Sequence, residues 1–474
     1  LSRPFSAEHF LSQLPGSVRK IAVLDRTKEP GGMGEPLYQD VESVIHRSRP
    51  DVKVVGGRYG LASKDTTPGQ IVAVYDNLVR ERPRDNFTIG IADDVTMTSL
   101  PYEEIAIPKE GETTCKIWGI GGDGTVGANK NTITTIGLAA GMYAQAYFSY
   151  DSKKSGGLTQ SHLRFGKKPI RSPYLVQHAD FVALHEPSYL GTYDVTADLK
   201  EGGTFLLNCS WSAGELSAHI PAKMKRDLAR KHADMYIIDA TKIARKIGLG
   251  NRTNTVLQAA FFKLTDIIPL DMAIREMEDG IYKSYFKKAG QKVVDMNNEA
   301  VERGITEVQR FDIPADWADA PDETPAARDV PGFIRDIVDP MNRQEGDRIP
   351  VSTFKKYNCI DGTWQNGTTQ YEKRGVAVLV PQWDADKCIQ CNQCSFACPH
   401  AAIRPVLLNA EEAGRAPASF RTVPAKGLSR YRYRMQVSPF DCMGCGVCAN
   451  VCIAREPALT MVPFAGQRAE QDNW

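Results

Sequence analysis

Two stretches decide the fold at the C-terminal end of this chain: Cys388-Ile-Gln-Cys-Asn-Gln-Cys-Ser-Phe-Ala-Cys-Pro399 and Cys442-Met-Gly-Cys-Gly-Val-Cys-Ala-Asn-Val-Cys452. They hold eight of the eleven cysteines, and both have the spacing Cys-x2-Cys-x2-Cys-x3-Cys. This is the ligand spacing of proteins that bind two 4Fe-4S clusters. The sequence therefore predicts two such clusters and an electron-transfer role for this region.

The fourth cysteine of each stretch is expected to bind the cluster of the other stretch. Three cysteines spaced by two residues lie on one tight loop, whereas the fourth is carried away on the helix that follows. Pro399 fits the bacterial pattern, but Ile453 stands at the equivalent place in the second stretch. We call the predicted ligand sets cluster 1 (Cys388, Cys391, Cys394 and Cys452) and cluster 2 (Cys442, Cys445, Cys448 and Cys398).

The two cluster loops differ in the residues between their cysteines. Gly444 and Gly446 flank the middle cysteine of the second loop, where glycine lets backbone N–H groups approach cluster sulfurs. The first loop has Gln390, Asn392 and Gln393 in this region. Because hydrogen bonds to sulfur help to set the reduction potential, the two clusters need not share one potential.

Zinc and disulfide bonds explain the cysteines less well. A zinc ribbon uses two pairs of thiolates per metal, so the third cysteine of each loop has no place in a tetrahedral site. The rest of the chain has only Cys115, Cys209 and Cys359, which are too few for a disulfide framework. A reducing, intracellular compartment is the expected location, either the cytoplasm or the matrix of a hydrogenosome-like organelle.

Size and charge narrow the classes of function. A chain of 474 residues, 42% of them hydrophobic, is long enough for about three domains. Lysine and arginine number 58 against 57 acidic residues, a balance that gives no reason to expect nucleic acid or an anionic membrane as a partner. The apolar stretch 136–148 is interrupted by Gly141 and Gln145, so no membrane span is expected. Because the sequence starts Leu1-Ser-Arg-Pro without methionine, we expect a piece of a longer or processed protein.

The first block, about residues 1–107, has the pattern of an open α/β sheet. Apolar stretches predict strands at Lys20–Leu24, Val52–Gly56 and Phe87–Ile91, and longer periodic stretches predict helices at Leu37–Arg47 and Ile71–Arg82. No nucleophile, base and orienting group stand at a recognisable spacing. We therefore interpret this block as a domain with a structural role.

The second block begins with a strand, a glycine-rich turn and a helix between Lys116 and Met142, followed by a strand at Ala144–Tyr150 that is expected to complete a βαβ unit. Its glycines fit G-x-G-x-x-G, a turn that favours phosphate at a helix N-terminus, with Asp151 near the ribose-binding position. A single match to this motif is weak evidence for nucleotide binding. A glycine turn that only allows close packing of helix on sheet explains the pattern as well. Gly119, Gly121 and Gly124 are the glycines of the motif.

The rest of the chain is predicted to continue as α/β. Strands are expected at 181–184, 205–207 and 235–240, followed by a helical tract, Asn254–Gly304, that is interrupted near Pro269 and Gly290. Residues 305–373 are rich in Asp, Pro and Arg and predict a linker or a small loop-rich module. The last block carries the cysteine stretches and, between them, an insertion at 407–435 that a minimal two-cluster ferredoxin does not need.

Taken together, the motifs resemble the pyruvate-oxidising members of the 2-oxoacid:ferredoxin oxidoreductase family. The resemblance covers the whole chain, and no single motif is as specific as the set. It rests on Val23-Leu-Asp-Arg-Thr-Lys-Glu29 with Gly34-Glu-Pro-Leu-Tyr38, Val54-Val-Gly-Gly-Arg-Tyr-Gly60, Gly119-Ile-Gly-Gly-Asp-Gly-Thr-Val-Gly-Ala-Asn-Lys130, Ser155-Gly-Gly-Leu-Thr-Gln-Ser-His-Leu-Arg-Phe-Gly166, Asn251-Arg-Thr-Asn-Thr255, and the first cysteine stretch continued as Cys398-Pro-His-Ala-Ala-Ile-Arg-Pro405.

The resemblance implies an α/β multidomain protein with four parts. Residues 1–107 resemble a transketolase C-terminal-like α/β domain, and residues 108–304 resemble the α/β gamma domain of the family. Residues 305–373 form the linker or small loop-rich module. Residues 374–474 form an α+β ferredoxin-like domain with two 4Fe-4S clusters.

The resemblance also implies a reaction, the oxidative decarboxylation of pyruvate with coenzyme A to acetyl-CoA and carbon dioxide, with ferredoxin or flavodoxin as electron acceptor. Thiamine diphosphate with Mg²⁺ would supply the carbanion chemistry. We expect thiamine diphosphate and a further 4Fe-4S cluster to be bound by domains or chains outside this sequence. This segment alone is then not expected to turn over, and a homodimer is expected.

Within the family, the gamma domain helps to form the coenzyme A site, so the glycine loop becomes a candidate contact for cofactor or coenzyme phosphates. Arg164 is a further candidate because guanidinium suits anionic groups, whereas His162 and His400 are interpreted as structural or supporting residues. The candidates for cofactor binding are Gly119, Gly121, Gly122, Asp123, Gly124, Thr125, Asn129, Lys130 and Arg164.

Two other functions remain open on the sequence alone. The chain could be an electron-transfer subunit linked to NAD(P)H or flavin, with the glycine loop holding the dinucleotide. Its first 370 or so residues could also be a scaffold that docks other subunits onto a ferredoxin. Reduction of the clusters by NADPH without a 2-oxoacid would distinguish the first alternative, and tight association with a thiamine-binding chain would favour the second.

Overall fold

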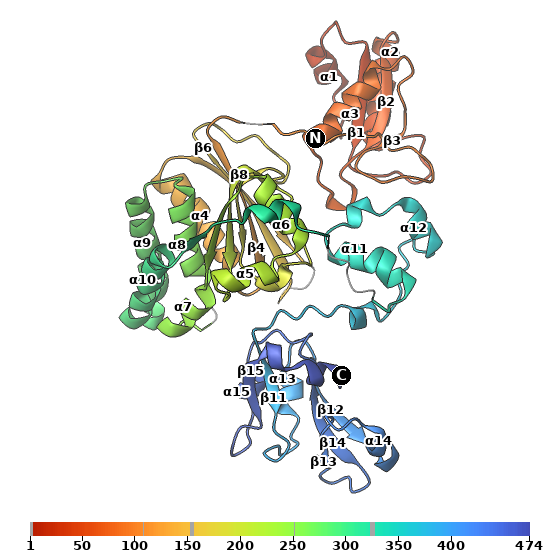
Figure 1. Cartoon of the computed structure of the whole chain (residues 1–474). Coiled ribbons are helices and arrows are strands. Elements are labelled where there is room, and N and C mark those ends of the chain that lie inside the picture. Colours follow the sequence, from red (N-terminus) through yellow and green to blue (C-terminus); the bar gives the residue numbers. More distant parts are fainter. Residues whose placement is uncertain (1–2, 108, 152–155, 251, 323–327) are drawn as a thin grey trace.

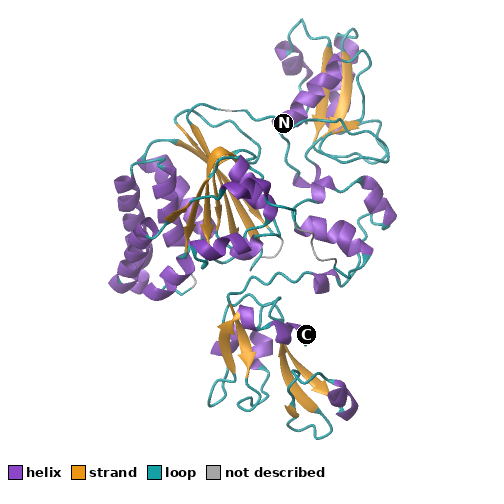
Figure 2. Cartoon of the chain, viewed as in Figure 1, coloured by secondary structure: helices purple, strands orange, loops and turns teal. Residues whose placement is uncertain are grey.

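The computed structural model describes residues 3–107, 109–151, 156–250, 252–322 and 328–474. They form four regions that follow one another along the chain, coloured from red to blue in Figure 1. Three regions contain β-sheets, and the region between the large sheet and the C-terminal sheets consists of short helical segments (Figure 2). The expected α/β multidomain class is therefore confirmed.

The first region is a small parallel sheet with a helix on each face. Alternate strand residues point to opposite faces, so Val23 packs with α2 while Leu24 packs with α3. Both helices begin at a proline, which suits the first helical turn. The strands are β1 (Lys20–Asp25), β2 (Lys53–Arg58) and β3 (Phe87–Thr88), in the order β1-β2-β3, and the helices are α1 (Ala7–Gln13), α2 (Pro36–Ser48) and α3 (Pro68–Val79).

The second region is built on a seven-stranded mixed sheet in the order β10-β9-β8-β7-β4-β6-β5. Strands β4, β7, β8 and β9 are parallel, while β6 is antiparallel to both β4 and β5, and β10 is antiparallel to β9. Their bounds are β4 (Glu112–Ile120), β5 (Tyr143–Tyr150), β6 (Leu158–Gly166), β7 (Ala179–Leu184), β8 (Leu199–Asn208), β9 (Asp234–Ile238) and β10 (Gln309–Phe311).

Helices cover both faces of this sheet, as Figure 1 shows. Phe181 and Ala183 of β7 face the cluster of α4, α8, α9 and α10, whereas Val182 and Leu184 face α5 and α6. This explains why β7 is apolar on both sides. The helices are α4 (Thr125–Ala139), α5 (Ala213–His219), α6 (Ala222–Arg230), α7 (Ala240–Ile247), α8 (Asn254–Thr265), α9 (Leu270–Ala289) and α10 (Gln291–Thr306).

The expected βαβ unit of Lys116–Tyr150 needs correction. Strands β4 and β5 run in the same direction, but they are not neighbours, because the antiparallel strand β6 lies between them. The predicted strand at 235–240 also ends earlier, since Asp239 caps α7 through its carboxylate, which accepts the Lys242 N–H at 2.8 Å. The helical tract is present and is interrupted where expected, before α9 and between α9 and α10.

The large sheet extends beyond Gly304, because β10 pairs with β9 at its edge.

The short helical region that follows has its own apolar core around Phe333, Ile337 and Cys359. It is tied to the first region by Ser352, whose backbone N–H donates to the Asp94 carboxylate at 2.9 Å. It is therefore folded rather than an open linker. It contains a π-helix (Ile334–Val338), α11 (Asp339–Asn342) and α12 (Val351–Lys356).

The C-terminal region has two small sheets around the cysteine loops. Strands β11 (Leu379–Trp383) and β15 (Leu459–Pro463) form an antiparallel pair, and the insertion forms a separate sheet in the order β12-β14-β13. The remaining elements are α13 (Gln393–Ala397), β12 (Ile403–Leu408), α14 (Ala410–Arg415), β13 (Val423–Pro424), β14 (Arg432–Val437), α15 (Val447–Asn450) and α16 (Arg468–Asp472).

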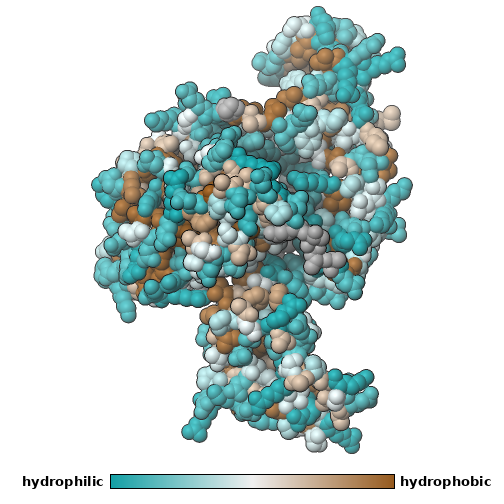
Figure 3. Space-filling view, in the orientation of Figure 1, coloured by the Kyte–Doolittle hydropathy of each residue, from teal (hydrophilic) through white to brown (hydrophobic). Residues whose placement is uncertain are grey.

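The surface mixes hydrophilic residues with single apolar ones on the face shown in Figure 3. Within the described part of the chain, no helix is both long enough and apolar enough to cross a bilayer. The longest helix is α9, with 20 residues, and it carries charged side chains along its length.

Candidate iron-sulfur centres and glycine-loop site

The four cysteines predicted for cluster 2 line one cavity. Three come from the second cysteine loop, and Cys398 comes from the first, beside Pro399. Met461 and Pro381 close the cavity from strands β15 and β11. The structure thus brings the fourth cysteine of one loop to the other loop, as two-cluster ferredoxins require.

The chemistry of this cavity suits a 4Fe-4S cluster. Cys442 and Cys448 are buried, and burial raises the pKa of the Cys442 thiol to about 11 and that of the Cys448 thiol to about 12. Thiolates at these positions therefore need a compensating positive charge, which iron supplies. The remaining lining, among it Val447 and Met461, is mostly apolar and excludes water.

Backbone N–H groups point at cysteine sulfurs in both loops. Gly444 N–H donates to Cys442 Sγ at 3.3 Å, and Gln390 N–H donates to Cys388 Sγ at 3.4 Å. Both donors have a positive φ, 69° for the glycine and 62° for the glutamine. A Cβ on Gly444 would lie 2.8 Å from the Leu379 carbonyl oxygen, so glycine is required there. Cys398 and Cys452 Sγ accept similar bonds from Ala402 and Ala458.

The insertion between the two cysteine stretches braces the first loop. Gln390, which adopts a conformation that favours glycine, has its side chain bonded to the Pro424 carbonyl at 2.9 Å and to the Lys426 N–H at 2.8 Å. Tyr433 of β14 donates its hydroxyl to Asn392 Oδ1 at 2.8 Å. These contacts stabilise a loop that lacks glycine, and they give the insertion a structural role.

The glycine loop joins β4 to α4 and is held together by Asp123. The Asp123 carboxylate accepts N–H bonds from Ile120 at 3.2 Å and Thr125 at 2.8 Å, and the Thr125 hydroxyl at 2.7 Å. Gly122 and Gly124 have φ values of 104° and 90°, which favour glycine. Asp123 is therefore a loop-forming residue whose oxygens already have partners.

Close packing also requires two of the glycines. A Cβ on Gly124 would lie 2.9 Å from the Asn254 side chain, and one on Gly119 would lie 2.9 Å from the Thr125 side chain. The packing explanation of the motif thus holds for these two residues. It does not exclude ligand binding by the same loop.

A solvent-open cavity of about 470 Å³ lies between the glycine loop and helices α8 and α9. The N-terminus of α4 contributes a partial positive charge, and Arg252 contributes a full one. Polar groups of Asn254 and Ser284 add hydrogen-bonding capacity. The helix N-terminus and Arg252 favour an anionic ligand such as a phosphate, whereas the Asp123 carboxylate, which also lines the cavity, carries a negative charge that opposes one. The loop residues of the cavity are Gly122, Asp123, Gly124 and Gly127.

Other predicted residues do not line this cavity. Asn129 is buried and donates to Ser161 Oγ at 2.9 Å, and Lys130 Nζ lies over the Phe148 ring at 5.6 Å. Asp151 faces the cluster region instead, with its carboxylate 3.8 Å from the Arg374 guanidinium. Ser155 and Asn251, which belong to the quoted family motifs, lie outside the described residues.

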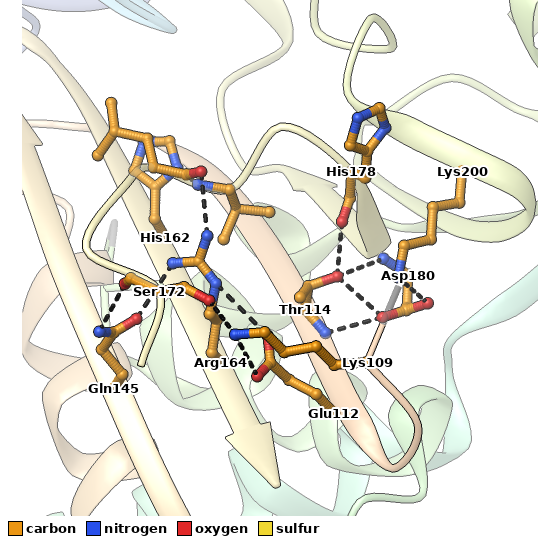
Figure 4. Close-up of polar contacts among 12 residues, drawn as sticks. Lys109, Glu112, Thr114, Gln145, His162, Arg164, Ser172, His178, Asp180 and Lys200 are labelled. Atoms are coloured by element: carbon orange, nitrogen blue, oxygen red, sulfur yellow. Dashed lines mark hydrogen bonds and ion pairs between the residues drawn. The ribbon is translucent and has the colours of Figure 1, made fainter. Parts of the chain in front are cut away.

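Arg164 is not part of the glycine-loop site. Gly119 pairs with Thr159, whereas Thr114 pairs with Arg164, so five residues, or about 16 Å of strand, separate the two places along β6. Figure 4 shows the guanidinium bonded to Gln145 at 3.1 Å and to a backbone carbonyl at 3.0 Å, beside Glu112. Arg164 therefore lies apart from the glycine loop, and its assignment to cofactor binding stays a prediction.

His162 is buried beside Arg164, as the structural interpretation expected. Its Nδ1 accepts the Val176 N–H at 3.2 Å, and burial lowers the pKa of the ring to about 3, helped by nearby Lys116 and Arg164. The ring is therefore neutral at ordinary pH. Its Nε2 has no hydrogen-bond partner among the described residues.

The glycine loop and the cluster 2 loop are in contact. Gly121 exchanges backbone hydrogen bonds with Gly156 and Gly157 at 2.9 and 2.7 Å. Met443, which follows Cys442, packs on Gly156, because a Cβ there would lie 1.6 Å from Met443 Cε. Arg374 donates to the Gly156 carbonyl at 2.5 Å. Cluster 2 therefore lies next to the glycine loop.

Sequence reasoning missed His185, which follows β7 directly. Its Nδ1 is 2.8 Å from the Thr125 hydroxyl, so it supports the glycine loop from the neighbouring strand. Polar residues at the carboxyl ends of parallel strands meet at one edge of a sheet. The predicted strand at 181–184 thus contained a usable signal for His185. Arg252 had no comparable signal, because it reaches the site from the start of α8.

We expect acid to loosen the glycine loop through His185. Burial lowers the pKa of His185 to about 4, although the Asp123 carboxylate opposes this shift. As the pH falls, His185 is therefore protonated at a higher pH in the unfolded chain than in the folded protein. The free energy of unfolding decreases as the pH falls from about 6.5 towards about 4. Between pH 7.5 and 6.0 we expect a loss of about 0.8 kcal/mol.

Hydrogen exchange of the α4 amides at these two pH values, corrected for intrinsic rates, measures this effect. Protection should fall about fourfold more in the parent protein than in the His185→Asn variant, which keeps a polar group near Nδ1 without a titrating ring. Equal pH dependence in both proteins would assign the loss to other groups.

Comparison with known proteins identifies three domains along the chain. Residues 114–307 match the family described as pyruvate ferredoxin/flavodoxin oxidoreductase, residues 320–377 match a domain of unknown function, and residues 387–454 match a 4Fe-4S double cluster binding domain. The last match contains all eight motif cysteines. The resemblance found in the sequence motifs is therefore confirmed.

Curated relatives extend the match to the whole chain. A pyruvate-flavodoxin oxidoreductase of Enterobacter agglomerans is 54% identical over 476 residues, which cover 100% of this chain and 40% of the relative. A pyruvate:ferredoxin oxidoreductase of Moorella thermoacetica is 54% identical over 468 residues, with 98% and 40% covered. The pyruvate oxidoreductase subunit PORC of Thermotoga maritima is a structural match at 23% identity and a TM-score of 0.35, covering 43% of this chain and 100% of that one. The chain spans about 40% of the length of the curated relatives.

Proposed function

We propose that this chain, whose residues 114–307 match the pyruvate ferredoxin/flavodoxin oxidoreductase family, is the electron-relay portion of an enzyme that oxidises pyruvate with coenzyme A. In this proposal the two clusters pass electrons to ferredoxin or flavodoxin in the cytoplasm. Thiamine diphosphate, Mg²⁺ and a further 4Fe-4S cluster are assigned to parts of the enzyme outside these 474 residues, and the enzyme is a homodimer.

The single observation that carries the proposal is the cavity lined by Cys398 together with the three cysteines of the second loop. Both cysteine stretches supply thiols to this cavity. This is what crossed ligand sets require, in which the fourth cysteine of each stretch binds the cluster of the other stretch. When bound, a 4Fe-4S cluster supplies one-electron storage at this place. The described residues exclude water, hold the sulfurs and direct N–H groups at them.

Contact between the regions supports a relay from the pyruvate-oxidising site through cluster 2 to cluster 1. Met443 and Arg374 hold the cluster 2 loop against Gly156, next to the glycine loop. Cys391 of cluster 1 is exposed, in the loop braced by the insertion, and Cys445 of cluster 2 is exposed as well. We propose cluster 2 as the entry point for electrons and cluster 1 as the exit.

We propose that the cavity beside the glycine loop binds phosphate groups of coenzyme A. The support is its shape and charge, since the α4 N-terminus and Arg252 both favour an anion. Gly119, Gly121, Gly122, Asp123, Gly124 and Thr125 would form the loop. Asn129 and Lys130 would act from behind it, in α4.

Iron and sulfide analysis of the anaerobically purified chain tests this function. We expect about eight iron atoms and eight acid-labile sulfides per chain, with an EPR signal from two interacting clusters after reduction by dithionite. One zinc ion per four cysteines without such a signal would reject it. Reduction of the clusters by NADPH alone would instead favour a pyridine-nucleotide-linked subunit.

A further inference from the structure

His400 lies between the cluster 2 cavity and a second, solvent-open cavity. It follows Cys398 by two residues, and its side chain lines the first cavity together with the four cysteines of cluster 2. Its other side lines the second cavity with Arg374, Arg404 and Trp474. His400 therefore lies at the boundary between the two cavities.

The Nε2 atom of His400 is buried and has no hydrogen-bond partner among the described residues. A buried polar atom without a partner destabilises the folded state, so such atoms are rare unless a further group satisfies them. Neutral imidazole with the proton on Nε2 is a donor, and sulfur in the adjoining cavity is an acceptor. A sulfur acceptor in the adjoining cavity would therefore give Nε2 the hydrogen-bond partner that it lacks.

The second cysteine stretch has no equivalent histidine. Cys398-Pro-His400 corresponds to Cys452-Ile-Ala454, so alanine stands where the donor would be for cluster 1. The two clusters therefore differ in one buried N–H donor.

We propose that His400 is a positioning and tuning residue for electron transfer, whose Nε2–H donates a hydrogen bond to a sulfur of cluster 2. This inference rests on the proposed iron-sulfur function. A donor at sulfur stabilises the extra negative charge of the reduced state, so His400 raises the reduction potential of cluster 2 relative to that of cluster 1. The residue makes cluster 2 the better acceptor of the electrons that enter beside the glycine loop.

Redox titration followed by EPR tests the proposal on the full chain with both clusters assembled. In His400→Leu, the ratio of reduced to oxidised cluster 2 at a fixed solution potential should fall about tenfold, which is about 59 mV for a one-electron couple. The midpoint of cluster 1, measured in the same sample, should not move. His400→Gln keeps an N–H donor at a similar reach and should retain most of the parent potential.

Three results would overturn the proposal. The ratio of reduced to oxidised cluster 2 in His400→Leu could change by less than twofold, or the midpoint potentials of both clusters could shift equally. The third is a midpoint shift of cluster 2 in His400→Gln as large as that in His400→Leu. A second measurement uses the parent protein and does not depend on how variants assemble. With ¹⁵N-labelled histidine, pulsed EPR of reduced cluster 2 should detect a weakly coupled nitrogen, and its absence would also reject the hydrogen bond. Failure to find two 4Fe-4S clusters at all would instead refute the proposed function.

Discussion

Replacing Cys398 with alanine is expected to abolish the 4Fe-4S signal of cluster 2 and to leave cluster 1 in place, although Cys398 belongs to the first cysteine stretch. The reason is spatial, because Cys398 lines one cavity with Cys442, Cys445 and Cys448. Conversely, Cys452→Ala should remove cluster 1. Each variant should lose one of the two EPR signals, and iron should fall from about eight atoms per chain towards about four.

Two matched variants decide whether the ligands are crossed. Cys445→Ala should give the same EPR spectrum as Cys398→Ala, and Cys391→Ala should give the same spectrum as Cys452→Ala. Cys359→Ala controls for nonspecific loss, since Cys359 lies in the small helical region, where its Sγ donates to the Phe354 carbonyl. If Cys398→Ala instead matched Cys391→Ala, each stretch would bind its own cluster and the crossed assignment would be wrong.

The cluster ligands could be found from the sequence because their spacing encodes local geometry. Cys-x2-Cys-x2-Cys fits one loop around one cluster, and a two-residue spacing does not depend on the rest of the fold. The helices after Asn254 were also predictable, since periodicity and Pro269 and Gly290 mark their ends locally. These features are set by residues close together in the sequence.

Features that depend on distant residues could not be predicted. Strand β6 enters between β4 and β5, and it separates the two strands that a βαβ pattern suggests should be neighbours. Arg164 has the chemistry of a phosphate-binding residue, yet its register on β6 places it away from the glycine loop. No spacing rule gives strand order or register over such distances.

The insertion between the cysteine stretches shows the same limit. From the sequence it is only an excess of about 30 residues over the minimal two-cluster pattern. In the structure, Pro424, Lys426 and Tyr433 hold Gln390 and Asn392 in conformations that glycine adopts in the second loop. Contacts from the insertion therefore stabilise a backbone conformation of the first loop that glycine adopts in the second. The role of the insertion follows only when both segments are considered together.

Replacing Glu470 with alanine is expected to destabilise the insertion sheet by about 3–5 kcal/mol, because it leaves the Arg434 guanidinium buried without its counter-charge. Arg434 and Glu470 form an ion pair with side chains only 4% and 18% exposed. Glu470 also accepts the Val437 N–H at 3.2 Å, so it ties the C-terminal helix α16 to β14. Loss of the carboxylate removes both contacts together.

Hydrogen exchange of the β14 amides measures this effect without requiring reversible global unfolding of a cluster protein. Protection of Tyr433 and Met435 should fall at least a hundredfold in Glu470→Ala. Arg468→Ala on the same helix is the matched control, since its pair with Asp472 is 76% and 60% exposed and should contribute at most about 1 kcal/mol.

A second variant separates the cost of an unpaired charge from the value of the pair itself. Arg434→Leu combined with Glu470→Leu removes both charges and keeps apolar volume, so it should recover much of the protection lost in Glu470→Ala. If Glu470→Ala lowered protection no more than Arg468→Ala, water would be reaching the Arg434 guanidinium. The C-terminal helix would then be held to β14 by its remaining contacts, among them the hydrogen bond from Gln436 Nε2 to the Glu470 backbone carbonyl at 3.0 Å.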